Sequence, residues 1–226
     1  MSEKDGQLER DAIRAMRRSY GEVGLESLPE DPFAAFHSWL SEAAANAFIV
    51  EANAMVLSTL GTDENGADAI TTRTVLLKDV SQGGFTFFTN YNSAKAQAID
   101  VNAEVSLLFP WYAMERQVII TARAEKVSRG ESEEYFASRP WSSQIGAWAS
   151  DQSMEISGRD VLEKRWQEIS AQYPEGSVVP LPENWGGFCA VPHSIEFWQG
   201  RYSRLHDRIR FTRASDGSWQ RHRLAP

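Results

Sequence analysis

The spacing of apolar residues changes along the chain, from helical in the first part to strand-like after residue 54. Phe33 and Phe36 share one face of a helix, and Asp31 before Pro32 supplies a typical N-cap and first helical position. A similar pattern is weaker near the N-terminus, where apolar residues alternate with charges. The pattern predicts helices over residues 7–20, 32–46, 93–100, 128–138 and 157–172.

After residue 54, β-branched and aromatic residues gather in short runs, which favour β-strands. Residues that tolerate a positive φ separate several of these runs, as at Asn65-Gly66 and Gly83-Gly84, and this suits antiparallel hairpins. The pattern predicts strands over residues 55–62, 70–80, 84–90, 105–111, 117–127, 195–199, 206–212 and 219–224.

The order of these elements predicts the fold class. The strands are mostly contiguous and the helices are inserted between them, which favours an antiparallel sheet or small barrel of α+β type, mainly β, with peripheral helices. Residues 1–30 are expected to form an N-terminal arm with a helix, and residues 31–226 a single domain. No glycine-rich phosphate loop occurs, so a phosphate group must be bound by side chains.

Composition narrows the possible functions. The chain of 226 residues has 23 Lys and Arg against 31 Asp and Glu, a formal charge of −8 that disfavours nucleic-acid binding. The single cysteine, Cys189, allows no internal disulfide, and the histidine spacings predict no metal site. We find no signal peptide or apolar membrane span in the sequence, and a reducing cytoplasmic location fits best.

Two groups of residues indicate phosphate binding. Arg73 and Lys78 flank an apolar strand on opposite faces, so either the strand lies between two ligand groups or it bulges. The alternative is an edge strand with solvated charges. In the second group, Tyr135 and Arg139 are four residues apart on one helix face, and Pro140 breaks that helix so that Ser143 can turn back toward them. A guanidinium with two hydroxyls can cradle a phosphate.

A third group lies near the C-terminus. In a strand, Arg204, His206 and Arg208 share one face, a costly arrangement unless an anion or an electron-rich ring lies against it. The two guanidinium groups favour a neutral imidazole that can accept a proton near pH 7. The alternative is a strand whose arginines are ion-paired with Asp207 and Glu196.

These groups together resemble the pyridoxamine 5′-phosphate oxidase family. The resemblance runs from Arg17 to Pro226, and its blocks are residues 73–78, 106–111, 115–118, 138–140, 143–148, 185–188 and 196–208. It implies an FMN-binding split barrel that works as a homodimer, with FMN at the subunit interface.

The resemblance also implies roles for individual residues. FMN is expected to be held in one subunit by Arg73, Val75, Leu76, Lys78, Phe88, Thr89, Lys95 and Gln117. The FMN site is expected to be completed, partly from the other subunit, by Gln152, Ser153, Trp198 and Arg208. The substrate phosphate is expected to bind Lys78, Tyr135, Arg139 and Ser143. The expected catalytic pair, which faces the reacting ring, is Arg204 and His206. A lid over the substrate is expected to contain Arg17 and Tyr20.

The implied reaction is oxidation of pyridoxamine 5′-phosphate or pyridoxine 5′-phosphate to pyridoxal 5′-phosphate. Dioxygen is the acceptor and hydrogen peroxide is released, with ammonia from the amine. Two alternatives remain: another split-barrel reductase that uses FMN or a deazaflavin, and a non-catalytic carrier of flavin or pyridoxal phosphate.

The chain departs from the family at two positions. Members usually have Ser-Arg-Lys where this sequence has Ser93-Ala94-Lys95, and often Tyr where Phe88 stands. If the missing guanidinium normally contacts the FMN phosphate, its loss weakens FMN binding by about 1.5 to 3 kcal/mol.

Overall fold

The computed structural model describes residues 10–16, 19–81 and 83–226. The helices of this part are α1 Arg10–Ala15, α2 Pro32–Ala45, α3 Ala94–Val101, α4 Arg129–Ser138, α5 Trp141–Ala149 and α6 Arg159–Gln172, with 3-10 turns η1 Tyr112–Met114 and η2 Tyr202–Arg204. The strands are β1 Ala54–Thr62, β2 Asp68–Leu76, β3 Asp79–Ser81, β4 Gly84–Asn90, β5 Glu104–Trp111, β6 Arg116–Lys126, β7 Trp185–Gln199, β8 Asp207–Arg213 and β9 Trp219–Leu224.

These strands form one sheet in which all neighbouring pairs are antiparallel, in the order β2-β1-β5-β6-β7-β4-β3. Strands β8 and β9 continue the sheet from β7. The fold is therefore mainly β with peripheral helices, as the sequence predicted.

Strand β7 pairs with different strands along its two halves. Its first residues pair with β4, from Trp185 to Ala190, and its last residues pair with β8, from Ser194 to Gln199. Strand β6 lies against both halves, and its register with β7 shifts at Thr121, where His193 is left out of the pairing. Pro192 lies at this change of partner, where a missing backbone N–H is tolerated because one side of the strand is unpaired.

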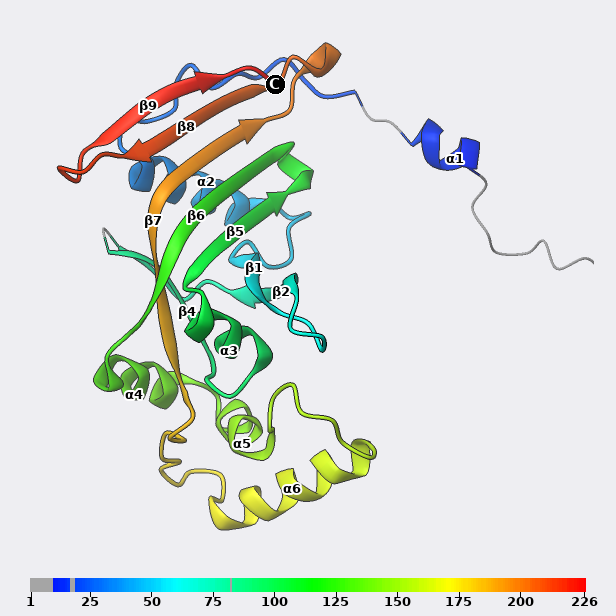
Figure 1. Cartoon of the computed structure of the whole chain (residues 1–226), viewed down its shortest axis with the longest axis vertical. Coiled ribbons are helices and arrows are strands. Elements are labelled where there is room, and N and C mark those ends of the chain that lie inside the picture. The colour runs from blue at the N-terminus through cyan, green and yellow to red at the C-terminus, as the bar shows by residue number, and fades with distance from the viewer. Residues whose placement is uncertain (1–9, 17–18, 82) are drawn as a thin grey trace, which may run out of the picture.

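The change of partner gives the molecule two ends. Strands β8 and β9 lie at one end of β7, and helices α4, α5 and α6 lie at the other (Figure 1). Helix α1 lies apart from the sheet in the same view.

The main core lies between α2 and the sheet. Helix α2 begins after Asp31, whose carboxylate accepts a hydrogen bond from Ala34 N–H at 2.7 Å. Phe36, fully buried, packs edge-on against Phe85 and against Phe109, with ring centroids 4.9 Å apart in each pair. A second, smaller cluster forms around Phe136, Ile145, Val179 and Trp185 at the end that holds α4 and α5.

Four sequence predictions need correction. The strand predicted over residues 70–80 is two strands, because the Leu77 N–H bonds to Asn53 O and the Lys78 N–H bonds to Thr86 O, which carries the chain from β1 to β4. The strand predicted at residue 195 begins ten residues earlier, at Trp185. Helix α5 was not predicted, and α1 ends at Ala15, not at residue 20.

The first residues of β7 include two glycines. Gly186 and Gly187 each stand where an aromatic ring approaches the backbone. A Cβ at Gly186 meets Tyr91 Oη at 2.2 Å, and a Cβ at Gly187 meets Phe88 Cε1 at 2.8 Å. The glycines therefore make room for side chains inside a strand.

Gly84, the first residue of β4, gives a test of the packing between β4 and β7. Its φ is +146°, and a Cβ there lies 2.3 Å from the carbonyl oxygen of Ala190. We expect Gly84→Ala to lower the free energy of unfolding by about 2 to 3 kcal/mol. Urea denaturation measures the change.

Gly217 is the matched control for this test. It also has a positive φ, +86°, but no atom lies within 4 Å of a Cβ there, so Gly217→Ala is expected to cost only about 1 kcal/mol. Equal losses for the two variants would show that the contact with β7 is unimportant.

Candidate functional site

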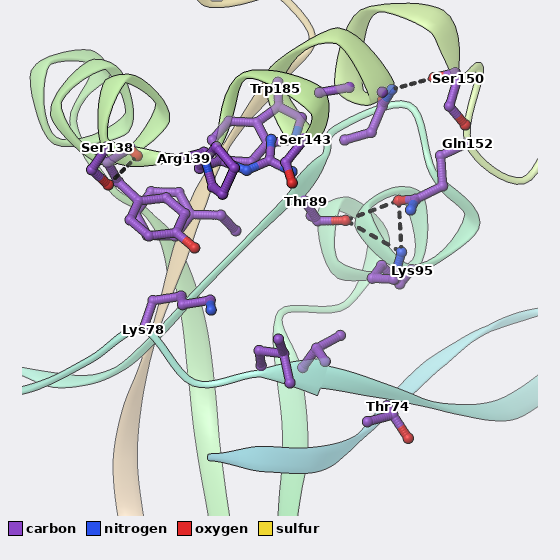
Figure 2. Close-up of a pocket in the computed structure, with 18 residues that line it drawn as sticks. Thr74, Lys78, Thr89, Lys95, Ser138, Arg139, Ser143, Ser150, Gln152 and Trp185 are labelled. Atoms are coloured by element: carbon purple, nitrogen blue, oxygen red, sulfur yellow. Dashed lines mark hydrogen bonds between the residues drawn. The ribbon is translucent and has the colours of Figure 1, made fainter. Parts of the chain in front are cut away.

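A cavity of about 550 Å³ lies between the β2–β4 region of the sheet and helices α4 and α5 (Figure 2). Its volume suits a ligand of cofactor size. Among the described residues, its lining contains three cationic side chains, those of Lys78, Lys95 and Arg139, and no carboxylate. In a chain with a formal charge of −8, this local excess of positive charge indicates an anion site.

Lys95 marks one end of the cavity. Its ammonium group donates hydrogen bonds to Gln152 Oε1 at 2.9 Å, Thr89 Oγ1 at 3.2 Å and Ser93 Oγ at 3.3 Å. Burial, and then the nearby positive charge of Arg73, lower the pKa of Lys95 to about 8. In the described part of the chain, no ion pair joins Lys95 to an acidic side chain. An anion bound at this end would therefore be attracted by the charges of both Lys95 and Arg73.

Arg73 is held from β2 against strand β1. Its guanidinium donates to Thr59 Oγ1 at 2.8 Å and to the carbonyl oxygen of Leu57 at 3.2 Å, and burial lowers the pKa of Arg73. The alternative interpretation of this segment was an edge strand with solvated charges. Strand β2 is an edge strand, but the Arg73 guanidinium is hydrogen-bonded to β1 and partly buried.

Arg139 marks the other end of the cavity. Its guanidinium lies 4.7 Å from the ring centroid of Trp185, and burial lowers the pKa of Arg139. Among the side chains described, Arg139 Nη1 is the buried polar atom without a hydrogen-bond partner. A buried donor left unpaired is costly unless a ligand supplies an acceptor, so this end also fits an anion.

Aromatic rings and helix α5 complete this end. The Tyr135 ring stacks on Phe88, with centroids 4.1 Å apart, and Lys78 Nζ lies 5.9 Å from the Tyr135 centroid. As predicted, the chain breaks at Pro140, and Ser143 in the first turn of α5 lines the cavity. Figure 2 shows Lys78 and Arg139 on one side of the cavity and Lys95 with Thr89 and Gln152 on the other.

The structure brings most of the predicted binding residues into this one cavity. The predicted residues that line it are Val75, Leu76, Lys78, Phe88, Thr89, Lys95, Tyr135, Arg139, Ser143 and Gln152. Ser153 lies beside it, where its hydroxyl accepts a hydrogen bond from Ala94 N–H at 3.2 Å. The roles proposed for these residues remain predictions.

Further residues line the cavity without having been predicted from the sequence. They include Asn90, Ser138, Ser150 and Trp185. Trp185 carried a signal, since it opens one of the blocks of the family resemblance, but an aromatic residue in such a block does not reveal that it lies beneath a guanidinium.

A second cavity, also of about 550 Å³, holds a different set of predicted residues. Tyr20, Arg204 and His206 line it. The Tyr20 ring meets His206 and Trp198 edge-on, with centroids 5.6 and 5.9 Å apart. None of the residues of this cavity lines the first one. Arg17 lies outside the described residues.

His206 has a defined tautomer. The backbone N–H of Arg201 donates a hydrogen bond to His206 Nδ1 at 3.1 Å. Because Nδ1 accepts this hydrogen bond, Nε2 is the ring nitrogen left to donate one. The hydrogen bond engages Nδ1, and the role expected for His206 toward the reacting ring remains a prediction.

The prediction that Arg204, His206 and Arg208 share one strand face is wrong. Arg204 lies in the turn η2, where Ser203 and Arg204 have φ values of 57° and 62°, and β8 begins only at Asp207. Two successive left-handed residues turn the chain before the strand starts, which strand alternation could not reveal.

Arg208 follows the alternative interpretation, in which arginines of this strand are ion-paired. Its Nη2 lies 2.7 Å from Glu196 Oε1, and Nη1 donates to the carbonyl oxygen of Ala225 at 3.0 Å. Arg208 forms a row with Trp198 and Gln117 across β8, β7 and β6. No member of this row lines the first cavity.

Family models match most of the chain. Residues 41–173 match the family described as pyridoxamine 5′-phosphate oxidase, and residues 185–226 match the pyridoxine 5′-phosphate oxidase C-terminal dimerisation region. The chain belongs to the pyridoxamine 5′-phosphate oxidase family. For this oxidase family member, the dimerisation region covers β7, η2, β8 and β9 with the loops between them, and it contains Arg204 and His206 of the second cavity.

Individual relatives agree with this assignment. A pyridoxine/pyridoxamine 5′-phosphate oxidase of Microcystis aeruginosa is 50% identical over 220 residues, covering 95% of this chain and 99% of the relative. One of Streptomyces avermitilis is 45% identical over 217 residues, covering 94% and 95%.

Solved structures resemble this family member as well. PhzG of Burkholderia lata, solved with tetrahydrophenazine-1-carboxylic acid, has a TM-score of 0.82 at 26% identity, covering 92% of this chain and 100% of that one. An FMN binding protein of Nostoc punctiforme, related to pyridoxamine 5′-phosphate oxidase, has a TM-score of 0.65 at 16% identity over 85% and 96%, which shows the split-barrel fold.

The described residues of this family member offer neither a membrane-spanning helix nor a metal cluster. Those residues contain no helix of the length and apolar character that crossing a membrane requires. They also contain no group of three or more His, Cys, Asp or Glu side chains placed to hold a metal ion.

The depressed pKa of Lys95 predicts a pH-dependent stability. Between pH 8 and 10.5 the unfolded chain holds the Lys95 proton and the folded ligand-free chain does not, so stability rises with pH over this window. Relative to Lys95→Met, the wild type should gain on the order of 1 kcal/mol between pH 7 and 9.5, after screening. Urea denaturation of both proteins at the two pH values measures this; a constant difference would contradict it.

Proposed function

We propose that this chain is an FMN-dependent oxidase that converts pyridoxamine 5′-phosphate and pyridoxine 5′-phosphate to pyridoxal 5′-phosphate. The observation that carries the proposal is the carboxylate-free cavity with cations at both ends, in a member of this oxidase family. Two anion-binding ends in one cavity suit two phosphate groups, one on the cofactor and one on the substrate.

The cavity fits FMN. The Lys95 end, with Arg73 behind it and the hydroxyls of Thr89 and Ser93 beside it, suits the FMN phosphate. Ala94 supplies no guanidinium here, so Lys95 and Arg73 carry the charge of this end. Val75, Leu76 and Phe88 offer an apolar wall of the kind that a flavin ring needs.

The Arg139 end suits the phosphate of the substrate. The unpaired Arg139 Nη1, the hydroxyl groups of Tyr135 and Ser143 and the ammonium of Lys78 all line it. A guanidinium fixed over the Trp185 ring and desolvated by burial binds a phosphate more strongly than one in water.

The second cavity completes the proposal through a partner subunit. Arg204 and His206 share no cavity with the phosphate-binding residues of their own chain, and they belong to the family's dimerisation region. We place them against the first cavity of a second copy in a homodimer, with FMN at the subunit interface. The strands that lead to the second cavity, β6, β7 and β8, carry Gln117, Trp198 and Arg208.

FMN held in this cavity would supply the two-electron redox chemistry of the reaction, with O2 as the final acceptor. The amine, O2 and water give the aldehyde, ammonia and hydrogen peroxide; the alcohol and O2 give the aldehyde and hydrogen peroxide. Arg204 orients the pyridine ring and balances its charge. His206 donates a hydrogen bond from Nε2 to a ring substituent, as its tautomer allows.

The N-terminal arm belongs to the same proposal. We place a lid over the second cavity at the described end of this arm, where Met16, Ser19 and Tyr20 line the cavity and Tyr20 lies edge-on to His206. The substrates carry phosphate, and such metabolites are held within cells, so we place the enzyme in the cytoplasm, where its single cysteine stays reduced.

The direct test starts from the purified protein loaded with FMN and desalted. We expect a retained flavin spectrum, and aerobic addition of pyridoxamine 5′-phosphate should yield pyridoxal 5′-phosphate and hydrogen peroxide in equal amounts. Retained flavin without turnover would favour a carrier or a reductase with another substrate. Loss of all flavin on desalting would contradict the assigned cofactor.

Arg204→Leu tests the role of the second cavity. Removing a charge that orients the ring should lower kcat/KM about 100-fold or more and leave FMN binding nearly unchanged. Steady-state kinetics and flavin content measure the two effects. Arg213→Leu, at the exposed far end of β8, is the matched control and should behave as wild type. Lost flavin with normal turnover per bound flavin would refute the role.

A further inference from the structure

Asp207 joins three separate segments of the chain beside the second cavity. It is the first residue of β8, and only 7% of its surface is exposed. Its carboxylate accepts hydrogen bonds from the Leu25 backbone N–H at 3.1 Å and from Arg201 Nη1 at 3.2 Å, and it pairs with Arg223 of β9. The N-terminal arm, the loop of residues 200–206 and the last strand therefore meet at one carboxylate.

Arg201 links this carboxylate to His206. Its side chain binds Asp207, while its backbone N–H donates to His206 Nδ1. Asp207 thus holds Arg201 in place, and Arg201 in turn sets the tautomer of His206. Arg201 also lies 3.8 Å from Glu26, but Glu26 is largely exposed and that contact is correspondingly weaker.

The loop needs such an anchor. Ser203 and Arg204 both have left-handed backbone conformations, which non-glycine residues adopt only when their surroundings hold them there. Tyr202, Ser203, Arg204 and Leu205 are exposed, so few packing contacts of their own hold the turn. The bonds that fix the loop lie at its ends: Gly200 N–H to Glu115 O at 2.7 Å, Tyr202 N–H to Gly21 O at 3.0 Å, and Arg201 on Asp207.

We propose that Asp207 is a positioning residue for the oxidase reaction. By clamping Arg201, its carboxylate sets the conformation of the loop, keeps His206 in the Nε2–H tautomer and holds Arg204 at the angle that the substrate requires. This inference rests on the proposed function for its kinetic consequence, but its structural consequence, the His206 tautomer, does not depend on any activity.

The test is Asp207→Asn in the FMN-loaded protein. Asparagine keeps an acceptor for the Leu25 N–H and removes the charge that holds two arginines. Because the phosphate of the substrate is bound at the other cavity, kcat should fall about 10- to 100-fold while KM stays within about threefold. In parallel, 15N NMR of histidine-labelled protein should show His206 change from one tautomer to a mixture.

The chain makes the NMR experiment simple, since it contains four histidines and His206→Gln identifies the signal. Glu30→Gln is the matched control, because the Glu30–Arg221 pair also joins the N-terminal segment to β9 but touches neither Arg201 nor His206. It should leave the His206 signal and kcat unchanged.

Several outcomes would overturn the proposal. If His206 gives the wild-type NMR signal in Asp207→Asn, Asp207 does not control its tautomer. If the signal changes but kcat stays normal, the tautomer does not matter for the reaction. If Asp207→Asn loses FMN or unfolds, Arg201→Gln takes its place and must shift the His206 signal in the same direction. Wild-type protein that binds FMN but oxidises neither substrate would refute the proposed function alone, and the NMR result would still decide the clamp.

Discussion

The arrangement of the molecule depends on one strand, β7, that hydrogen-bonds to different partners along its two halves. A continuous barrel strand keeps the same neighbours throughout, but β7 leaves β4 at Ala190 and takes up β8 at Ser194. The residues between them include Pro192, which lacks a backbone donor, and His193, which stands outside the pairing with β6. From this point the sheet continues through β4 on one half of β7 and through β8 on the other. The first cavity lies at the β4 half and the second at the β8 half.

The first cavity shows a conflict between folding and binding. Two cations are placed near each other at Lys95 and Arg73, and a third, Arg139, is left with a buried nitrogen unpaired. Each arrangement makes the ligand-free protein less stable than a neutral lining would, and each is relieved by a phosphate group. The binding free energy of two phosphates therefore also stabilises the fold, so that ligand-bound protein is expected to be the more resistant form.

Much of the fold could be predicted from local pattern. The N-cap at Asp31 placed α2 correctly, and the helix predicted from residue 128 is α4, which begins with a capping box between Ser128 and Glu131; both signals are short-range hydrogen bonds. The errors arose where long-range packing decides the outcome. Gly186 and Gly187 in β7 accommodate the rings of Tyr91 and Phe88, which lie about a hundred residues away in sequence.

The site divides in the same way. The residues around Arg139 could be grouped from the sequence, because helix spacing and Pro140 set their relative positions. The loop beyond Gln199 could not, since its path depends on left-handed residues. Asp207 could be named from the sequence as an ion-pair partner of arginines, but not as the group that joins Arg201 to the Leu25 backbone.

The hairpin loop between β7 and β8 has exposed residues from Tyr202 to Leu205, while the phosphate-binding cavity is built into the sheet and two helices. Substitutions in this loop leave the core and the phosphate grip intact. Natural selection can therefore change the reaction at one end of the molecule while the other end continues to hold the same kind of ligand. The divided sheet gives the fold two parts that can evolve at separate rates.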